Sequence, residues 1–185
     1  MTVSSPSHCP DLPLLLLDEE CTYPNLFHAF SEYCNSFSAP LHLCGLSLGA
    51  VLALHYAIKN PGKVGSLVLI APQYKMPQKL LQLQNVIFRC MPKSAFQGLG
   101  FDKWNFIKLT DSMSRLDFTE HLDITCPLLI LCGEKDYANK RACVQLVSQL
   151  PHATFQLVEK AGHEVNKDAP EALATILNHF YAKLL

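Results

Sequence analysis

Short apolar runs alternate with amphipathic stretches along most of the chain. Apolar runs bounded by Pro, Gly or Asn are typical of buried strands, and apolar residues spaced three and four apart are typical of helices. The run Leu67-Val68-Leu69-Ile70 is apolar at every position, which indicates burial on both faces of a parallel sheet. The pattern predicts strands at 14–17, 41–45, 64–71, 128–131 and 154–158, and helices at 25–37, 48–60, 138–150 and 170–185. This alternation predicts an α/β fold, in which helices flank a mostly parallel sheet with right-handed crossovers.

Residues 73–125 interrupt the alternation. They contain amphipathic helical patterns, separated by Pro92 and by Gly98-Leu99-Gly100, and no strand pattern. Residues 1–11 have little pattern and are expected to form a loose tail. We therefore expect a single domain over residues 1–185, with 73–125 as a helical insertion over one end of the sheet.

Composition excludes several classes of partner. A chain of 185 residues with 49% apolar residues can form a substantial core, and its net charge of −1 offers no basic surface for nucleic acid. The apolar runs are too short to span a membrane, and the run at 14–17 lacks the length and the preceding basic residues of a signal peptide. We therefore expect neither nucleic acid nor membrane as a partner.

The eight cysteines contain no C-x-x-C pair, so they indicate neither a zinc site nor a redox motif. Cys44, Cys126, Cys132 and Cys143 lie in or beside the expected core elements, where free cysteine behaves as a small hydrophobic residue. Free thiols are typical of the reducing cytoplasm, which is the expected location.

The most specific chemical motif is Gly45-Leu46-Ser47-Leu48-Gly49, which lies between a strand pattern and a helix pattern. In this context Gly-x-Ser-x-Gly predicts a nucleophile elbow, a turn so sharp that the serine hydroxyl is lifted clear of the sheet. Gly45 and Gly49 are expected to leave room where a Cβ would clash. The N–H of Leu48, at the start of the helix, is placed to stabilise an oxyanion. The alternative is a serine in an ordinary glycine-rich turn.

A serine nucleophile needs a base, and both should lie in loops at the carboxyl ends of the strands. Only His163, in Lys160-Ala161-Gly162-His163-Glu164, follows an expected strand closely, and it is the predicted base. The other histidines lie in the tail, in expected helices, within a strand or ahead of one: His8, His28, His42, His55, His121, His152 and His179.

The base in turn needs an orienting acid, and Gly133-Glu134-Lys135-Asp136 follows the strand at 128–131. Either carboxylate could reach the imidazole, but the shorter side chain and later position favour Asp136 over Glu134. Alternatively, the acidic turn only caps the helix that begins near Ala138. The acids of the helical block are weaker candidates: Asp111, Asp117 and Asp123.

The order Ser…Asp…His is that of the α/β hydrolases, and from about residue 40 to its end the chain resembles this superfamily. The likeness lies in the elbow at 45–49, the strand and turn at 126–136, and Ala161-Gly162-His163-Glu164 followed by Asp168-Ala169-Pro170-Glu171. The resemblance implies that residues 73–125 form a cap that shapes the substrate pocket.

The chain departs from the family before residue 40. Family members usually carry several strands ahead of the elbow, including one with a His-Gly type motif that supplies an oxyanion-hole N–H. Here only residues 14–17 offer a strand, which we expect to pair beside 41–45, with a second oxyanion N–H near Asp18 or Glu19. In another register Pro10-Asp11-Leu12-Pro13 is similar to the end of a family strand, and 14–17 is a loop.

These residues predict a serine hydrolase that cleaves a small carboxylic ester. His163 takes the proton of Ser47 as it attacks the carbonyl, Asp136 orients the imidazole, and the Leu48 N–H stabilises the oxyanion before water hydrolyses the acyl-enzyme. A cap rich in Leu, Phe and Met indicates an apolar substrate, with thioesters, amides and carbon–carbon bonds left open. This chemistry requires no metal and no organic cofactor.

Two other hypotheses remain. A shortened hydrolase fold with an incomplete oxyanion hole could bind a small apolar ligand or a partner protein without turnover. Alternatively, the chain is a fragment whose front sheet is supplied by another chain or a longer product. In that case its exposed edge strand favours a homo-oligomer.

Overall fold

The computed structural model describes residues 7–16, 19–38, 40–97 and 100–184. These residues form two compact units. Within the described ranges, the sheet unit contains residues 7–8, 40–74 and 119–184, and the helical unit contains residues 9–38 and 75–118. Residues 1–6 of the expected tail lie outside the described residues.

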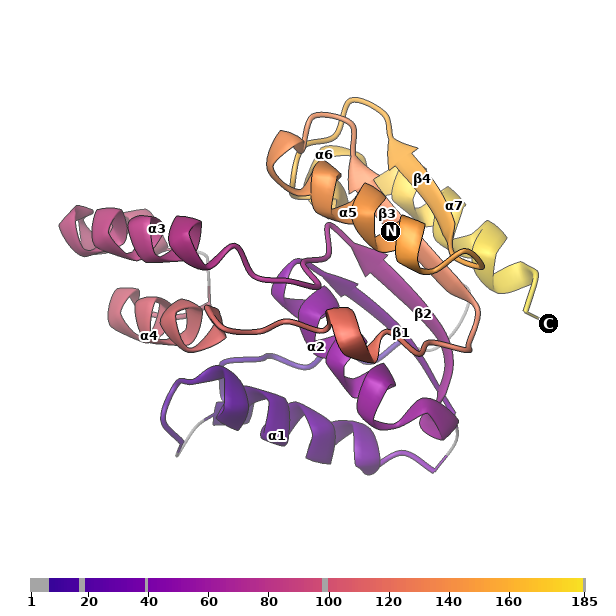
Figure 1. Ribbon diagram of the computed structural model, residues 1–185, viewed down its shortest axis with the longest axis horizontal. Coiled ribbons are helices and arrows are strands. Elements are labelled where there is room, and N and C mark those ends of the chain that lie inside the picture. The colour runs from indigo at the N-terminus through magenta and orange to yellow at the C-terminus, as the bar shows by residue number, and fades with distance from the viewer. Residues whose placement is uncertain (1–6, 17–18, 39, 98–99, 185) are drawn as a thin grey trace. The chain divides into compact units, whose positions relative to one another are not determined.

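Four parallel strands in the order β1-β2-β3-β4 form the sheet (Figure 1). The strands are β1 (Leu41–Leu46), β2 (Val64–Ile70), β3 (Leu128–Gly133) and β4 (Thr154–Val158). The helices of this unit are α2 (Leu48–Lys59), α5 (Tyr137–Gln149), α6 (Val165–Asp168) and α7 (Pro170–Ala182), with 3₁₀ turns η2 (Pro61–Lys63) and η4 (Thr119–His121). The predicted parallel α/β architecture is confirmed.

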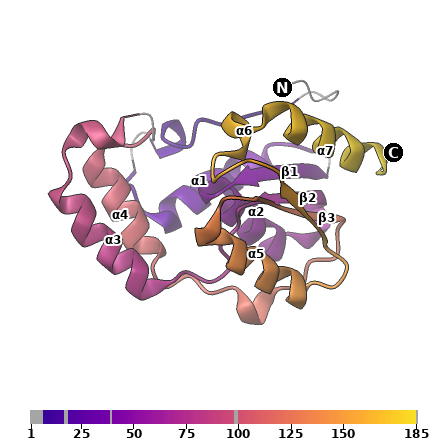
Figure 2. The same ribbon diagram turned by 90° about the horizontal axis from the view of Figure 1, so that it is seen from above.

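The chain order of the strands explains how the helices are layered. Each new strand is added on the same side of the previous one, so right-handed crossovers place α2 and α5 on one face. Helix α7 follows the last strand and covers the other face (Figure 2). Its Leu173 and Leu177 pack against side chains of the two inner strands, namely Val68, Ile70, Leu129 and Leu131. Both inner strands are almost wholly buried, as the apolar run in β2 predicts.

Strand β1 is an edge strand, because among the described residues it pairs only with β2. His42 and Cys44 are exposed on it, so Cys44 lies on an expected strand but beside the core rather than within it. The His42 ring is hydrogen-bonded to the Ser66 hydroxyl at 2.8 Å and lies edge-on to Tyr181. All eight cysteines are free thiols.

The predicted strand at residues 14–17 is wrong. Residues Leu14–Leu16 form the 3₁₀ turn η1 in the helical unit, and Leu17 lies outside the described residues. The Leu16 N–H donates to the Pro13 carbonyl at 3.1 Å. This hydrogen bond within the turn takes the place of one to a neighbouring strand. A four-residue apolar run does not by itself distinguish a strand from a tight turn with one buried side chain, here Leu16. The alternative register, which makes this run a loop, is closer to the structure.

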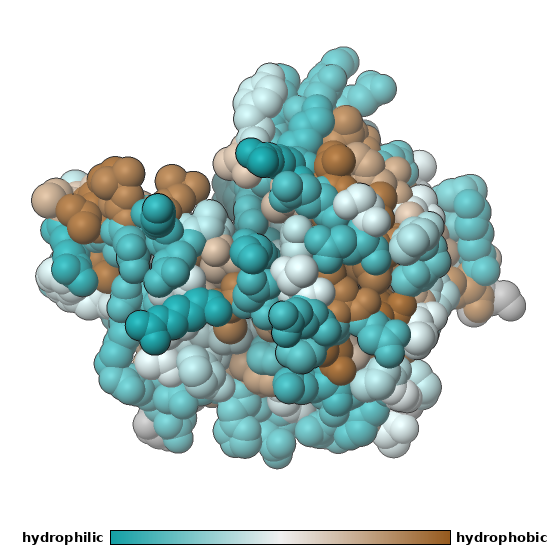
Figure 3. Space-filling view, in the orientation of Figure 1, coloured by the Kyte–Doolittle hydropathy of each residue, from teal (hydrophilic) through white to brown (hydrophobic). Residues whose placement is uncertain are grey.

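The helical unit comprises α1 (Tyr23–Asn35), α3 (Gln78–Cys90) and α4 (Lys103–Met113), with the 3₁₀ turns η1 and η3 (Lys93–Phe96). Helix α1 is tied to α4 by the Tyr23 N–H, which donates to the Ser112 hydroxyl at 2.8 Å. Helices α3 and α4 are joined by the Thr110 hydroxyl, which donates to Asn85 at 2.7 Å. Exposed apolar side chains gather over α3 in Figure 3.

The predicted insertion at 73–125 therefore divides between the units. Residues 75–118 join α1 in the helical unit, whereas 119–125 belong to the sheet unit. The separator Gly98-Leu99 lies outside the described residues, and Gly100 has a φ of 80°, which favours glycine.

Candidate active site

Ser47 occupies a strained turn between β1 and α2. Its φ of 54° and ψ of −113° lie outside the regions that L-residues ordinarily adopt. The turn is fixed on both sides, because the Ser47 N–H donates to the Ile70 carbonyl at 2.9 Å and its carbonyl accepts from the Val51 N–H at 3.1 Å. Backbone strain of this kind is concentrated at functional sites.

The two glycines of the motif have different roles. A Cβ on Gly45 would lie 2.2 Å from the Gly49 carbonyl oxygen, so the sharp turn requires glycine there. A Cβ on Gly49 would meet nothing within 4 Å. The expectation that both glycines avoid a clash is therefore right for Gly45 and wrong for Gly49, because the helix backbone passes Gly45 and leaves the outer side of Gly49 open.

Leu48 is the first residue of α2. The first N–H groups of a helix have no partner within it, so the Leu48 N–H is not used by the helix. Asp18, the other region considered for an oxyanion donor, lies outside the described residues, and Glu19 belongs to the helical unit.

The acid loop follows β3. Asp136 is 5% exposed and caps α5, with its carboxylate accepting from the Asn139 N–H at 3.3 Å. Its own N–H donates to the Gly133 carbonyl at 3.0 Å, which closes the turn. The side chain thus has the helix-capping role considered from the sequence, and it also contacts the histidine described next.

His163 and Asp136 are in direct contact. The His163 Nδ1 lies 2.8 Å from Asp136 Oδ2, with the imidazole side chain 42% exposed and the carboxylate side chain 4% exposed. An imidazole that donates its Nδ1 proton to a carboxylate keeps its lone pair on Nε2, where it can accept a proton. The Glu134 carboxylate instead accepts from the Lys160 N–H at 2.9 Å. Of the two acids weighed from the sequence, only Asp136 meets the histidine.

The loops after β3 and β4 are held together by their backbones. The Glu134 N–H donates to the Val158 carbonyl, and the Lys135 N–H donates to the Ala161 carbonyl, both at 2.9 Å. A Cβ on Gly133 would lie 1.9 Å from the Gly162 oxygen, so only glycine permits this approach. No local pattern marks Gly133 as a packing position, because the contact joins residues far apart in the chain.

Two amides extend the contact between His163 and Asp136. The Asn139 side-chain nitrogen donates to both oxygens of Asp136 at 2.9 Å and lies 3.1 Å from His163 Nδ1. The Asn139 oxygen accepts from the Gln73 side chain at 2.8 Å, which fixes the orientation of the amide. Asn139 is three residues after Asp136, the spacing at which an N-cap side chain meets the helix backbone. This N-capping pattern is the sequence signal that could have identified Asn139 as a neighbour of Asp136.

Ser47 and this pair follow strands whose carboxyl ends lie at the same edge of the sheet. Among the described residues the Ser47 hydroxyl makes no hydrogen bond to His163. The non-glycine residues with positive φ in the described ranges all follow strand ends at this edge: Ser47, Ala71 and Lys160. Strain is thus confined to the edge that carries the candidate residues.

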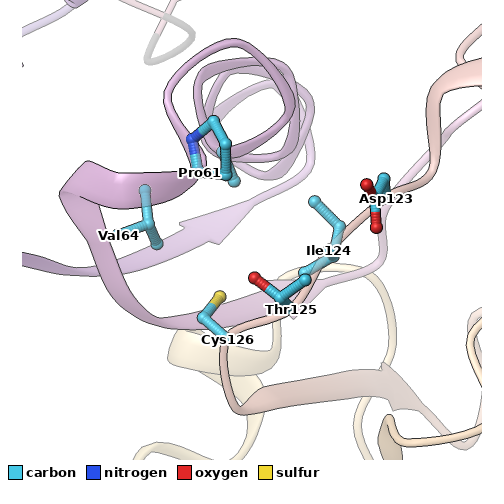
Figure 4. A pocket seen from close by; sticks show the side chains of 7 residues that line it. Pro61, Val64, Asp123, Ile124, Thr125 and Cys126 are labelled. Atoms are coloured by element: carbon cyan, nitrogen blue, oxygen red, sulfur yellow. The ribbon is translucent and has the colours of Figure 1, made fainter.

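A shallow feature lies at the opposite edge of the sheet. A depression near the start of β2 and β3 is lined by Pro61, Val64, Ile124 and Cys126 among others (Figure 4), and it is too tight to hold a water molecule. Among the described residues no group of three or more His, Cys, Asp or Glu side chains could hold a metal ion.

Comparison with known proteins identifies the family. The sequence profile of the alpha/beta hydrolase family matches residues 4–176. The chain belongs to the α/β hydrolase family. The fold agrees, because the esterase of Thermogutta terrifontis superposes with a TM-score of 0.71 at 19% identity, over 88% of this chain and 73% of that one.

Two curated relatives of this α/β hydrolase are named as lipid hydrolases. The human monoacylglycerol lipase ABHD6 is 25% identical over 199 residues, which cover 85% of this chain and 59% of that protein. The probable lysophospholipase BODYGUARD 1 of Arabidopsis thaliana is 41% identical over 61 residues, 32% of this chain and 13% of that protein. The chain thus spans about three-fifths of the length of the monoacylglycerol lipases that it matches.

Proposed function

We propose that this chain is a serine hydrolase in which Ser47, His163 and Asp136 form the catalytic triad. The observation that carries the proposal is the 2.8 Å hydrogen bond between His163 Nδ1 and Asp136 Oδ2. It holds the tautomer that leaves Nε2 as a base, on the edge of the sheet where the strained turn presents Ser47.

The reaction proceeds through an acyl-enzyme. His163 Nε2 accepts the Ser47 proton as the serine oxygen attacks the ester carbonyl, and the buried Asp136 carboxylate stabilises the imidazolium. The imidazolium then protonates the departing alcohol, and a water activated by His163 releases the acid. The Leu48 N–H stabilises the oxyanion in both steps.

The oxyanion hole bears on the expected rate. The described residues supply the Leu48 N–H at the start of α2, but no second donor is assigned there. A second donor typically contributes about 3–4 kcal/mol to stabilising the transition state.

The substrate we propose is an ester of a single fatty acyl chain. Two observations support it: the names of the relatives, a monoacylglycerol lipase and a probable lysophospholipase, and the many Leu, Phe and Met residues of the 73–125 segment. This proposal replaces the small carboxylic ester expected from the sequence with an ester that carries a long acyl chain.

A fluorophosphonate probe tests the nucleophile, and p-nitrophenyl esters of increasing chain length test the substrate. Labelling and hydrolysis should be lost in Ser47→Ala and His163→Ala. They should persist in Ser148→Ala and His152→Ala, which alter exposed residues of the same types. Labelling that survives in Ser47→Ala would place the nucleophile at another residue. A folded wild-type protein that is never labelled would favour a non-catalytic binding protein.

A further inference from the structure

Helix α3 presents an apolar stripe to solvent. Its members are exposed large side chains: Leu80 (58%), Leu83 (58%), Val86 (56%) and Ile87 (53%). Positions spaced three and four apart lie on one side of a helix, so Leu80, Leu83 and Ile87 form a continuous line. Brown atoms gather over this helix in Figure 3.

The stripe is not the face by which α3 packs in its own unit. That face carries Asn85, which is buried and bonded to Thr110 of α4. It also carries Phe88, whose ring meets those of Phe96 and Phe106. Helix α3 therefore has one side committed to α4 and a second apolar side that is exposed. Contiguous exposed apolar surface of this kind marks an interaction site.

Charge around α3 indicates what the stripe contacts. Residues 73–101 contain four basic residues and no acidic residue, although the whole chain has a net charge of −1. Lys75 is paired with Asp117 at 2.7 Å, whereas Lys79, Arg89 and Lys93 extend from exposed positions. Lys79 and Arg89 are on α3 and Lys93 follows it in η3. An exposed apolar stripe in a segment whose charged residues are all basic is typical of a helix that lies in the interface of an anionic membrane.

We propose that α3 docks in the plane of an anionic phospholipid surface, with Leu80, Leu83 and Ile87 inserted among the acyl chains and Lys79, Arg89 and Lys93 at the phosphates. No helix in the described ranges is long and apolar enough to cross a bilayer. This revises the expectation, based on hydropathy, that the chain has no membrane partner.

A second copy of α3 fits the stripe less well. Two such helices placed side by side would bring basic residues together without an acidic residue to pair with them, whereas paired helices use opposite charges at their flanks. Docking goes beyond the proposed function and does not depend on it, because no atom of the triad takes part.

Cosedimentation with vesicles tests the proposal. The full chain should bind vesicles of phosphatidylcholine and phosphatidylserine, and Ser47→Ala should bind equally, whatever its activity. The double variant Leu83→Ser/Ile87→Ser should bind at least about tenfold more weakly, because it removes two of the inserted side chains. The matched control is Val144→Ser on α5, which alters an exposed side chain (51%) outside the stripe and should leave binding unchanged.

The charges are tested separately. Lys79→Gln, Arg89→Gln and Lys93→Gln should each weaken binding to the anionic vesicles by about fivefold and should reduce its dependence on salt. Circular dichroism establishes that each variant keeps its fold.

Three results would overturn the proposal. Wild-type protein could fail to sediment with anionic vesicles, or Val144→Ser could weaken binding as much as the double variant. Light scattering could instead show a dimer that the double variant dissociates while vesicles bind neither form, and the stripe would then be a contact between copies.

Discussion

The carboxyl ends of β3 and β1 carry the two halves of the candidate site, yet they are built differently. Strand β3 is buried at all six positions and is paired on both sides. Its terminal loop is bonded to the loop after β4, and together they hold Asp136 against His163. Within the described part of the chain, strand β1 is an edge strand with exposed side chains. Ser47, which follows it, is positioned by the turn into α2 and by one hydrogen bond to β2.

The two parts of the candidate site are therefore held in place by different kinds of contact. Asp136 and His163 are aligned by contacts between segments far apart in the chain, so their geometry depends on the packing of two loops. Ser47 is positioned mainly by the local geometry of its turn, with one hydrogen bond to β2. Substitutions near β3 should therefore act on the acid–base pair, whereas those near β1 should act on one turn.

The largest expected effect is on activity, and it distinguishes Asp136 from Glu134, the two acids of the loop after β3. Asp136→Asn should lower kcat/KM for a p-nitrophenyl ester about 10⁴-fold, because the amide no longer favours the required imidazole tautomer. Glu134→Gln should keep most of the activity, since an amide oxygen can still accept from the Lys160 N–H. Equal losses in the two variants would contradict the assignment of Asp136.

Substitutions of three glycines test whether the ends of β1 and β3 require close contacts between backbone segments. Gly133→Ala and Gly45→Ala place a Cβ 1.9 Å and 2.2 Å from backbone oxygens, so each should lower the free energy of unfolding by about 3 kcal/mol or more. Gly49→Ala has open space and should be neutral or stabilise the helix by up to about 1 kcal/mol. Urea denaturation measures all three. If Gly45→Ala were as stable as Gly49→Ala, the described elbow geometry would be wrong.

A substitution at Asn139 tests whether its side-chain amide helps to hold Asp136 against His163. Asn139→Ala removes two hydrogen bonds to the Asp136 carboxylate and should reduce kcat about tenfold, with a smaller effect on KM. The pH profile of kcat/KM should also shift, which a purely structural role would not cause. Gln145→Ala, an exposed change on the same helix, should leave both measurements unaltered.

The smallest expected effect is on stability, and it concerns His55 in α2, the helix that follows the elbow. Burial and, to a lesser extent, Lys59 lower the pKa of His55 from 6.5 to about 4. The unfolded chain therefore binds a proton at a higher pH than the folded one. Neutral His55 therefore makes its full contribution to the free energy of unfolding above pH 6.5, and this contribution is lost as the pH falls toward 4. The urea midpoint of His55→Gln should decline less over this interval than that of the wild type, and parallel curves would contradict the assignment.

The sequence alone determined the features that depend on near neighbours. The strand at 154–158 has the same bounds in the structure, the elbow lies between the expected strand and helix, and α2 ends at the predicted terminator before Pro61. Apolar periodicity and the stereochemistry of Gly and Pro act within a few residues, so they can be recognised from the chain itself.

Tertiary structure decided the rest. Whether residues 14–17 form a strand depended on a partner in the sheet, and the described residues form a turn in the other unit instead. The contact of Asp136 with His163, the support from Asn139 and Gln73, and the need for glycine at 133 all arise where two distant loops meet. Such contacts are set by how the strands pack side by side, and residues brought together only by packing leave no local pattern in the sequence.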